Sequence, residues 1–153
     1  MIYYGDEAGM WGANDPCDRK PMIWPEMEYE PEAMLPDGRP RPLADEVAFD
    51  YDLFDFYRRL IAIRQASPAL RRGDYRTLLA DDDRRLFAFA RQTDDDAAVV
   101  ALNAGDLMEV VELDVPAGTW TDALNGEQYV AANGRLSLTV PPLWGVILRR
   151  TAG

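Results

Sequence analysis

Eight short segments rich in apolar residues follow one another between residues 74 and 149, separated by clusters of Asp, Asn and Gly. Spacings of about 8–12 residues are typical of an antiparallel sandwich or barrel, in which each segment is a strand. The dipeptides Asn125-Gly126 and Asn133-Gly134 favour hairpin turns. The predicted strands span residues 74–79, 85–91, 98–102, 108–115, 118–122, 127–130, 135–140 and 145–149. The fold class is therefore predicted to be mainly β.

An amphipathic helix is predicted before these strands, over residues 50–66. Apolar residues recur there at spacings of three and four, and most charged residues fall on the opposite side. Acidic residues lie near its start, and Arg58, Arg59 and Arg64 come later, which is the order that the helix dipole favours. Pro68 is expected to end the helix.

Glycine and proline interrupt residues 1–43 so often that no long helix fits there. Only residues 1–4 are predicted as a strand, and it is very short. A loop of about 40 residues inside a compact domain is more often functional than a neutral connection. The alternative is a disordered tail, but Trp11 and Trp24 argue against it because disordered segments carry few aromatic residues.

The 153-residue chain contains 16 basic and 27 acidic residues, which gives a net charge of −11. Such a negative surface repels phosphate groups, so we expect neither nucleic acid nor a membrane as a partner. The chain has no histidine and one cysteine, Cys17. This excludes Ser-His-Asp and Cys-His catalytic sites and histidine-based metal sites within the chain. Any chemistry must therefore use carboxylates, Arg, Tyr or Trp.

Two acidic triplets, residues 81–83 and 94–96, are interpreted as hairpin tips next to arginine, and metal ligation is the alternative. We predict no cofactor and no metal site. Asp6 and Glu7 stand where a secretory signal is basic, and no apolar run approaches the roughly 20 residues of a membrane helix. These features favour a cytoplasmic location.

The first 24 residues combine aromatic rings with Asp, Glu and Arg. Proteins bind sugars with these groups, because rings cover the apolar C–H patches while carboxylates accept and guanidinium groups donate hydrogen bonds to hydroxyls. A loop packed by its own aromatic residues has the same composition. Composition alone therefore leaves sugar binding and simple packing equally open.

The order of the residues adds a resemblance to a known family. The runs IYYGDEAGM at residues 2–10, NDP at 14–16 and DRKPMIW at 18–24 resemble the end of the catalytic barrel in the alpha-amylase superfamily of glycoside hydrolases. They are most similar to the branch of neopullulanase, cyclomaltodextrinase and maltogenic amylase. The run DLFDFYRRLIAIR at 52–64, with SPAL at 67–70, resembles the last barrel helix and the entry to the C-terminal β domain. The similarity covers essentially the whole chain.

The resemblance implies a C-terminal antiparallel β-sandwich preceded by the last strand, a long loop and the last helix of a (β/α)8 barrel. The implied domains are residues 1–70, a remnant of the catalytic barrel, and residues 71–153, the β-sandwich. The family is retaining and cleaves alpha-1,4 and alpha-1,6 glucosidic bonds, and its catalytic carboxylates lie on barrel strands that precede the segment matched by residue 1. We therefore expect a C-terminal portion of a glycosidase that is inactive alone. The alternative is a stand-alone β-sandwich module that binds glucan or a partner protein.

By the same resemblance, Asp15 and Arg19 bind a glucosyl unit next to the cleaved one, and Tyr4, Asp6 and Glu7 support the site by hydrogen bonds. The purely structural alternatives are a turn or cap role for Asp15 and an ordinary surface ion pair for Arg19. Cys17 departs from the family order Asp-Pro-acid-Cys-Arg because it precedes Asp18. The spacing of four between Asp15 and Arg19 is kept.

The chain has four tryptophans, and each is a candidate sugar platform or packing residue. Trp11 is expected beside the cleft, Trp24 in packing, and Trp120 and Trp144 in the core or an interface, with sugar stacking as the alternative for the last two. The expected partners are an alpha-glucan oligosaccharide in the intact enzyme and the missing N-terminal barrel segment. Barrel surface left exposed in the lone chain is expected to cause self-association, or partial disorder before about residue 50.

Overall fold

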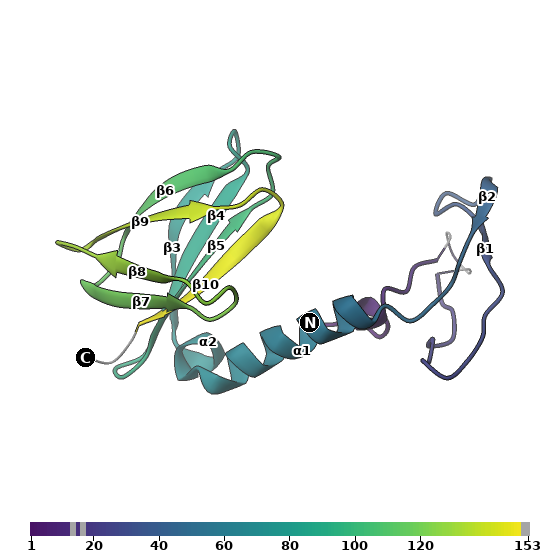
Figure 1. Ribbon diagram of the computed structural model, residues 1–153, viewed down its shortest axis with the longest axis horizontal. Coiled ribbons are helices and arrows are strands. Elements are labelled where there is room, and N and C mark those ends of the chain that lie inside the picture. The colour runs from purple at the N-terminus through teal and green to yellow at the C-terminus, as the bar shows by residue number, and fades with distance from the viewer. Residues whose placement is uncertain (13–14, 16–17, 151–153) are drawn as a thin grey trace. The chain divides into compact units, whose positions relative to one another are not determined.

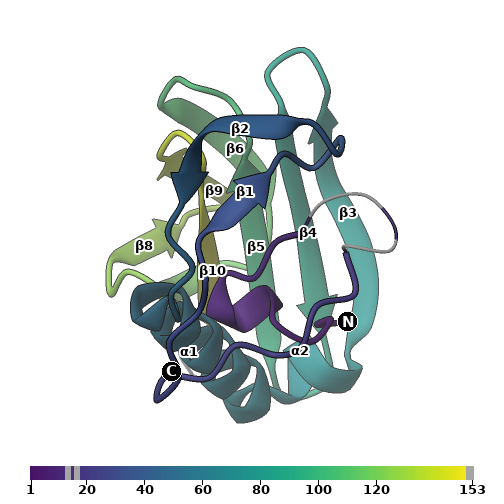
Figure 2. The same cartoon turned by 90° about the vertical axis from the view of Figure 1, so that its right-hand side faces the viewer.

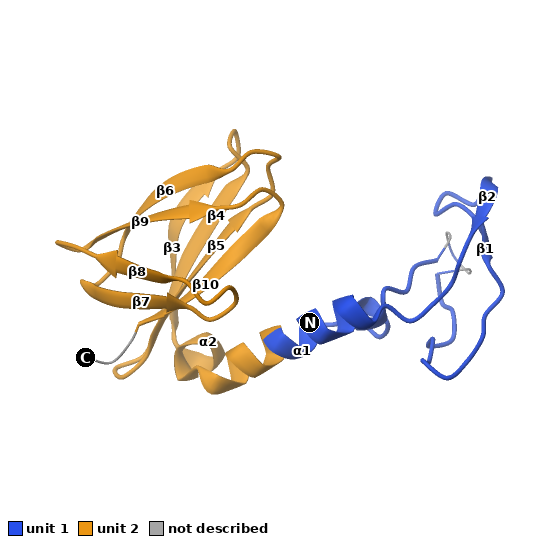
Figure 3. Cartoon of the chain, viewed as in Figure 1, with its two compact units in different colours: residues 1–59 blue, residues 60–153 orange. Residues whose placement is uncertain are grey.

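The computed structural model describes residues 1–12, 15 and 18–150. The chain forms two compact units, Met1–Arg59 and Leu60–Gly153, which Figure 3 shows in blue and orange. Helix α1 (Tyr51–Ala66) crosses the boundary between the two units. The predicted division of this chain into domains of residues 1–70 and 71–153 stays a prediction.

The first unit contains the short 3-10 helix η1 (Asp6–Ala8) and a hairpin of β1 (Glu32–Met34) and β2 (Pro40–Asp45). The two strands pair antiparallel, Glu32 opposite Asp45 and Met34 opposite Pro40, with a bulge between these pairs. Prolines at positions 31, 40 and 42 argue against strands here, since proline has no backbone N–H to donate to a sheet. The hairpin tolerates these prolines because its two strands are short and pair only with each other.

The prediction of a strand over residues 1–4 is wrong. The chain instead turns back, because Asp6 N donates to Tyr3 O at 3.1 Å and Tyr3 N donates to Asp6 Oδ2 at 2.9 Å. Gly5 occupies the left-handed region at φ 89°, and a Cβ there would lie 2.4 Å from Met10 Sδ. A strand requires a neighbour for its backbone groups, and no described strand pairs with this segment.

The predicted helix over residues 50–66 is confirmed as α1. Asp50 caps its first turn, since Asp50 Oδ1 accepts from Leu53 N at 2.9 Å. The helix ends at Ala66, and Pro68 is the first residue of a second helix, α2 (Pro68–Arg72). Ser67 is the N-cap of α2, accepting from Leu70 N at 3.2 Å. None of the described helices is long and apolar enough to cross a membrane.

All eight predicted strands are present in the second unit, each within two residues of the expected bounds. Their bounds are β3 (Asp74–Asp81), β4 (Leu86–Gln92), β5 (Ala97–Asn103), β6 (Glu109–Asp114), β7 (Gly118–Asp122), β8 (Gln128–Ala131), β9 (Arg135–Val140) and β10 (Trp144–Arg150). Figure 1 shows them as a sandwich of two antiparallel layers, which confirms the predicted fold class. One layer has the order β3-β4-β5-β10-β7-β8, and the other is the pair β6-β9.

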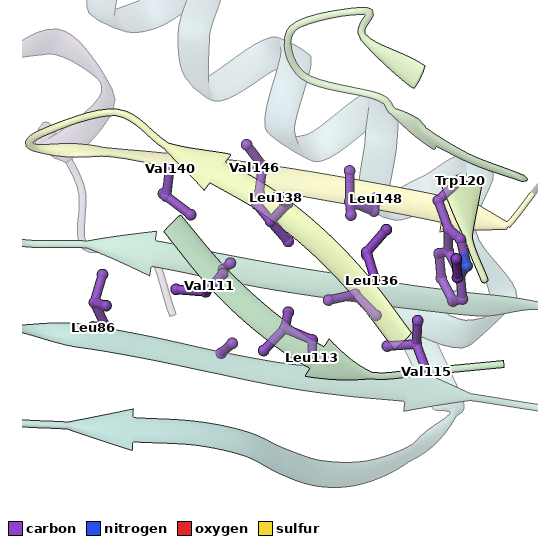
Figure 4. Close-up of a cluster of buried hydrophobic side chains, with 14 of the residues drawn as sticks. Leu86, Val111, Leu113, Val115, Trp120, Leu136, Leu138, Val140, Val146 and Leu148 are labelled. Carbon is purple, nitrogen blue, oxygen red and sulfur yellow. The ribbon is translucent and has the colours of Figure 1, made fainter. Parts of the chain in front are cut away.

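The core of the sandwich lies between these two layers, as the side chains in Figure 4 show. Strand β9 alternates exposed and buried residues, and Leu136, Leu138 and Val140 point into the core. Trp120 is 1% exposed and its Nε1 donates to Pro116 O at 3.2 Å, which confirms the packing prediction for this residue. Burying such a ring removes roughly 150–250 Å² from water and contributes about 4–6 kcal/mol.

Strand β5 is buried on both faces. Val99 and Ala101 face the core, while Ala98 and Val100 pack with Ala69 and Leu70 of α2 on the other face. In Figure 2, β5 lies beside β4, with β3 beyond it. This double burial explains the continuous apolar run of β5.

Trp144 is not a core residue. Its side chain is on β10, the residue is 41% exposed, and its Nε1 donates to Asn125 Oδ1 at 3.0 Å. Asn125 in turn donates to Asp122 Oδ2 at 2.5 Å. Trp144 is the first residue of β10. An interface role for Trp144 stays a prediction.

The predicted turns are present, and one of them also changes layer. Asn125-Gly126 joins the paired strands β7 and β8. Asn133 and Gly134, at φ 52° and 80°, form a two-residue turn across which Ala132 and Arg135 exchange two backbone hydrogen bonds of 2.9 Å. Because β8 and β9 belong to different sheets, this turn carries the chain from one layer to the other.

The acidic triplets lie at the hairpin turns, the first beginning at Asp81, the last residue of β3, but Asp96 of the second points inward. Its side chain is 11% exposed, and Asp96 Oδ2 accepts from Ser67 Oγ at 2.6 Å and from Ala69 N at 3.0 Å. Arg149 lies 3.4 Å from the other oxygen. Asp96 therefore ties the first turn of α2 to β10. Among the described residues, no group of three or more His, Cys, Asp or Glu is arranged to hold a metal ion.

Burial alone would raise the pKa of Asp96, but the hydrogen bonds from Ser67 and Ala69 and the attraction of Arg149 outweigh it and hold this pKa below its ordinary value. A carboxyl whose pKa is lower in the folded state stabilises the fold above the pKa of the unfolded chain. That contribution is lost as the pH falls through the folded pKa, below about 4.

We expect Asp96→Asn to lower the free energy of unfolding by about 1–3 kcal/mol at neutral pH, because the buried donors lose a charged acceptor. Urea titration followed by circular dichroism measures this change. The exposed neighbour Asp95 provides the matched control, Asp95→Asn, with little expected effect. The difference between Asp96→Asn and the parent should shrink as the pH falls below about 4. A difference that stays constant down to low pH contradicts this account of Asp96.

Candidate functional site

The segment from Trp11 to Lys20, here called the Asp15 loop, carries the two residues predicted to bind substrate. Asp15 and Arg19 lie together, with Arg19 Nη2 donating to Asp15 Oδ1 at 2.5 Å. Their side chains are 67% and 66% exposed. Arg19 Nε also lies 4.0 Å from Asp18. Asn14, Pro16 and Cys17 of the same motif lie outside the described residues.

Opposite charges at contact distance make this pair nearly neutral as a unit. A carboxylate offers several acceptor sites, and a guanidinium group offers donors in a fixed planar fork. Side chains of this kind at an exposed position are suited to neighbouring hydroxyl groups, which need one donor and one acceptor. The substrate-binding roles of Asp15 and Arg19 nevertheless stay predictions.

The three residues predicted to support the site lie on the first turn and differ in their contacts. Tyr4 Oη donates to Lys20 O at 2.8 Å, so Tyr4 contacts one end of the Asp15 loop. Asp6 accepts from Tyr3 N and stabilises its own turn. Glu7 Oε2 is buried without a hydrogen-bond partner among the described residues. Tyr4 thus connects the turn to the loop by a hydrogen bond, and the supporting roles of all three stay predictions.

Both ends of the Asp15 loop contact the hairpin β1–β2. The guanidinium carbon of Arg41 lies 4.1 Å from the centre of the Trp11 ring, a cation–π contact. Lys20 forms an ion pair with Glu32 and its Nζ lies 5.6 Å from the Trp11 ring. Sequence reasoning missed these partners because no motif links residues that are 12 and 30 positions apart.

A pocket of about 210 Å³ lies at the base of this arrangement, lined by Met10, Trp11, Lys20, Tyr29, Glu46 and neighbouring residues. Trp24 does not line it and is 50% exposed in this chain, and the packing role of Trp24 stays a prediction. The backbone of Trp24 makes two local hydrogen bonds: its N donates to Tyr29 Oη at 2.5 Å and its carbonyl accepts from Met27 N at 3.1 Å.

Comparison with known proteins assigns the second unit to a family. Residues 75–147 match the family described as maltogenic amylase, C-terminal domain. Neopullulanase 2 of Thermoactinomyces vulgaris is 38% identical to this chain over 151 residues, which is 97% of this chain and 22% of that protein. The chain thus spans about a fifth of the length of this curated relative.

Two solved structures share the fold, one of them over nearly the whole chain and the other over about two thirds of it. A structure described as cyclomaltodextrinase has a TM-score of 0.72 and 28% identity over 98% of this chain and 23% of its own. A complex of the protein AmyP with maltotriose has a TM-score of 0.60 and 26% identity over 69% of this chain and 22% of its own. The β-sandwich is therefore a maltogenic amylase C-terminal domain, and the chain corresponds to a C-terminal portion of the glycosidases of the alpha-amylase family.

Proposed function

We propose that this chain contributes to a retaining glycosidase that cleaves alpha-1,4 and alpha-1,6 bonds of alpha-glucans. In this proposal Asp15 and Arg19 bind a glucosyl unit, Tyr4, Asp6 and Glu7 support them, and the β-sandwich stabilises the catalytic barrel. The observation that carries the proposal is the exposed pair of Asp15 and Arg19 on a loop fixed at both ends.

The chemistry of the pair favours a neutral polyhydroxylated ligand. The chain has a net charge of −11, which disfavours anionic ligands. The paired Asp15 and Arg19 add almost no net charge, and together they offer both acceptors and donors. An alpha-glucan oligosaccharide meets these conditions because it is uncharged and carries several hydroxyl groups on each glucose unit.

The relatives support the same ligand class. One is called neopullulanase, one structure is called cyclomaltodextrinase, and AmyP was solved with maltotriose bound. These three proteins share the chemistry of alpha-linked glucose. We extend this ligand class to our chain because the similarity runs along most of its length.

We further propose that the chain has no hydrolytic activity by itself. Retaining hydrolysis needs a nucleophile and an acid roughly 5–5.5 Å apart on a rigid frame. The family resemblance assigns both carboxylates to barrel strands that precede the segment matched here. The role of the chain is then to complete the substrate-binding wall and to cover apolar surface of the barrel.

The purified chain should release no reducing sugar from cyclodextrin, starch or pullulan, because the proposed catalytic carboxylates lie outside it. A reducing-end assay on material purified twice by different methods measures this. The intact enzyme under the same conditions is the positive control. Turnover that persists in the chain through repurification would contradict the assignment of the catalytic carboxylates.

In the intact enzyme, Arg19→Ala should lower kcat/KM on short maltooligosaccharides by the equivalent of about 1–3 kcal/mol, the range for hydrogen bonds to a charged donor. Arg58→Ala is the matched control, since Arg58 also forms an exposed local ion pair, with Asp55 at 2.8 Å. Steady-state kinetics on maltotriose compares kcat/KM of Arg19→Ala with that of Arg58→Ala. Equal kcat/KM values for Arg19→Ala and the parent remove Arg19 from the site.

A further inference from the structure

Two side chains of the hairpin β1–β2 reach the two ends of the Asp15 loop. Glu32 on β1 pairs with Lys20, and Arg41 on β2 stacks on Trp11. The loop between Trp11 and Lys20 carries both Asp15 and Arg19. The hairpin therefore contacts the loop where the loop begins and where it ends.

In the ion pair of Lys20 with Glu32, the Glu32 carboxylate is largely buried. The side chain of Glu32 is 10% exposed, and Glu32 Oε1 also accepts from Met34 N at 3.1 Å within the hairpin. The Lys20 carbonyl accepts the hydroxyl of Tyr4. Lys20 is thus held through its side chain by the hairpin and through its backbone by the first turn. A buried carboxylate that loses its cation is costly, so this contact strongly favours one loop position.

The contact at Trp11 has a fixed orientation. Arg41 Nε donates to Met34 O at 3.2 Å and its Nη1 lies 3.0 Å from Asp45, so the hairpin itself sets the plane of the guanidinium group. That group then covers the Trp11 ring at 4.1 Å. Lys20 Nζ lies 5.6 Å from the same ring, so the first and last residues of the loop are neighbours. Arg41 and Glu32 of the hairpin therefore hold the two ends of the loop.

We propose that the hairpin β1–β2 positions Asp15 and Arg19 for binding an alpha-glucan, with Glu32 and Arg41 as the positioning residues. This inference rests on the proposed function. Fixing both ends of a loop reduces the ordering that binding would otherwise require, which improves affinity without any new contact to the ligand. Glu32 and Arg41 therefore act on substrate only through the loop.

A first experiment tests the anchoring without measuring activity. In the full chain, trypsin cleavage after Arg19 reports how often the loop opens. Glu32→Gln and Arg41→Met should each accelerate this cleavage several-fold, while Glu28→Gln, which changes an exposed residue in the same way, should not. Thermal unfolding of each variant checks that it is folded. If Glu32→Gln does not fold, the cleavage rate of Arg41→Met alone decides the outcome. Cleavage at the parent rate in both variants overturns the proposal.

A second experiment tests the consequence for substrate. In the intact enzyme, Glu32→Gln should raise KM for maltotriose roughly 2- to 10-fold, the factor that corresponds to one net hydrogen bond, with kcat little changed. In an Arg19→Ala background the same substitution should have almost no further effect, because residues that act as a unit are not additive. An equal rise of KM in both backgrounds overturns the positioning role.

The two experiments separate the hairpin proposal from the function on which it rests. Faster cleavage together with an unchanged kcat/KM in Arg19→Ala overturns the proposed function, and with it the role of the hairpin in binding. Unchanged cleavage together with a reduced kcat/KM in Arg19→Ala overturns the hairpin proposal alone.

Discussion

The β domain depends on one constraint, which is that two sheets must share a single apolar core. The smaller sheet has only β6 and β9, and a two-stranded sheet is marginally stable without a packing partner. Alternation along β9 directs Leu136, Leu138 and Val140 onto the larger sheet, where Trp120 and Leu148 meet them. Register, turn positions and layer order then follow, because a shift of one residue would expose every one of these side chains.

This constraint explains why sequence alone predicts the β domain well. Strand periodicity and turn dipeptides are local, so β3 to β10 are recognisable from short stretches of the chain. The inward position of Asp96 is different, since its acceptor role depends on Ser67, 29 positions earlier. An acidic triplet in a hairpin loop has the same sequence whether its last member faces solvent or caps a helix.

The first unit is harder to predict from sequence than the β domain, and the reason is physical. Residues 1–4 have the composition of a strand, but backbone groups form a strand only against a neighbour, and here they form a turn with Asp6. Conversely, the hairpin β1–β2 contains prolines that argue against a strand, yet it is stabilised by contacts between side chains far apart in sequence, such as Arg41 with Trp11. Only the family resemblance points to Asp15 and Arg19, since no spacing rule distinguishes them from other acidic and basic neighbours.

The two units also differ in how their local structure is held. Trp120 and the other core residues share contacts with many neighbours, so the loss of one leaves the layer arrangement specified by the rest. The Asp15 loop instead depends on a small number of polar and cation–π contacts made by Tyr4, Glu32 and Arg41. Contacts of this kind are directional, and each one restrains a particular atom. Single substitutions outside such a loop can therefore change its position while the β-sandwich keeps its structure, because function-bearing loops vary independently of the scaffold that carries them.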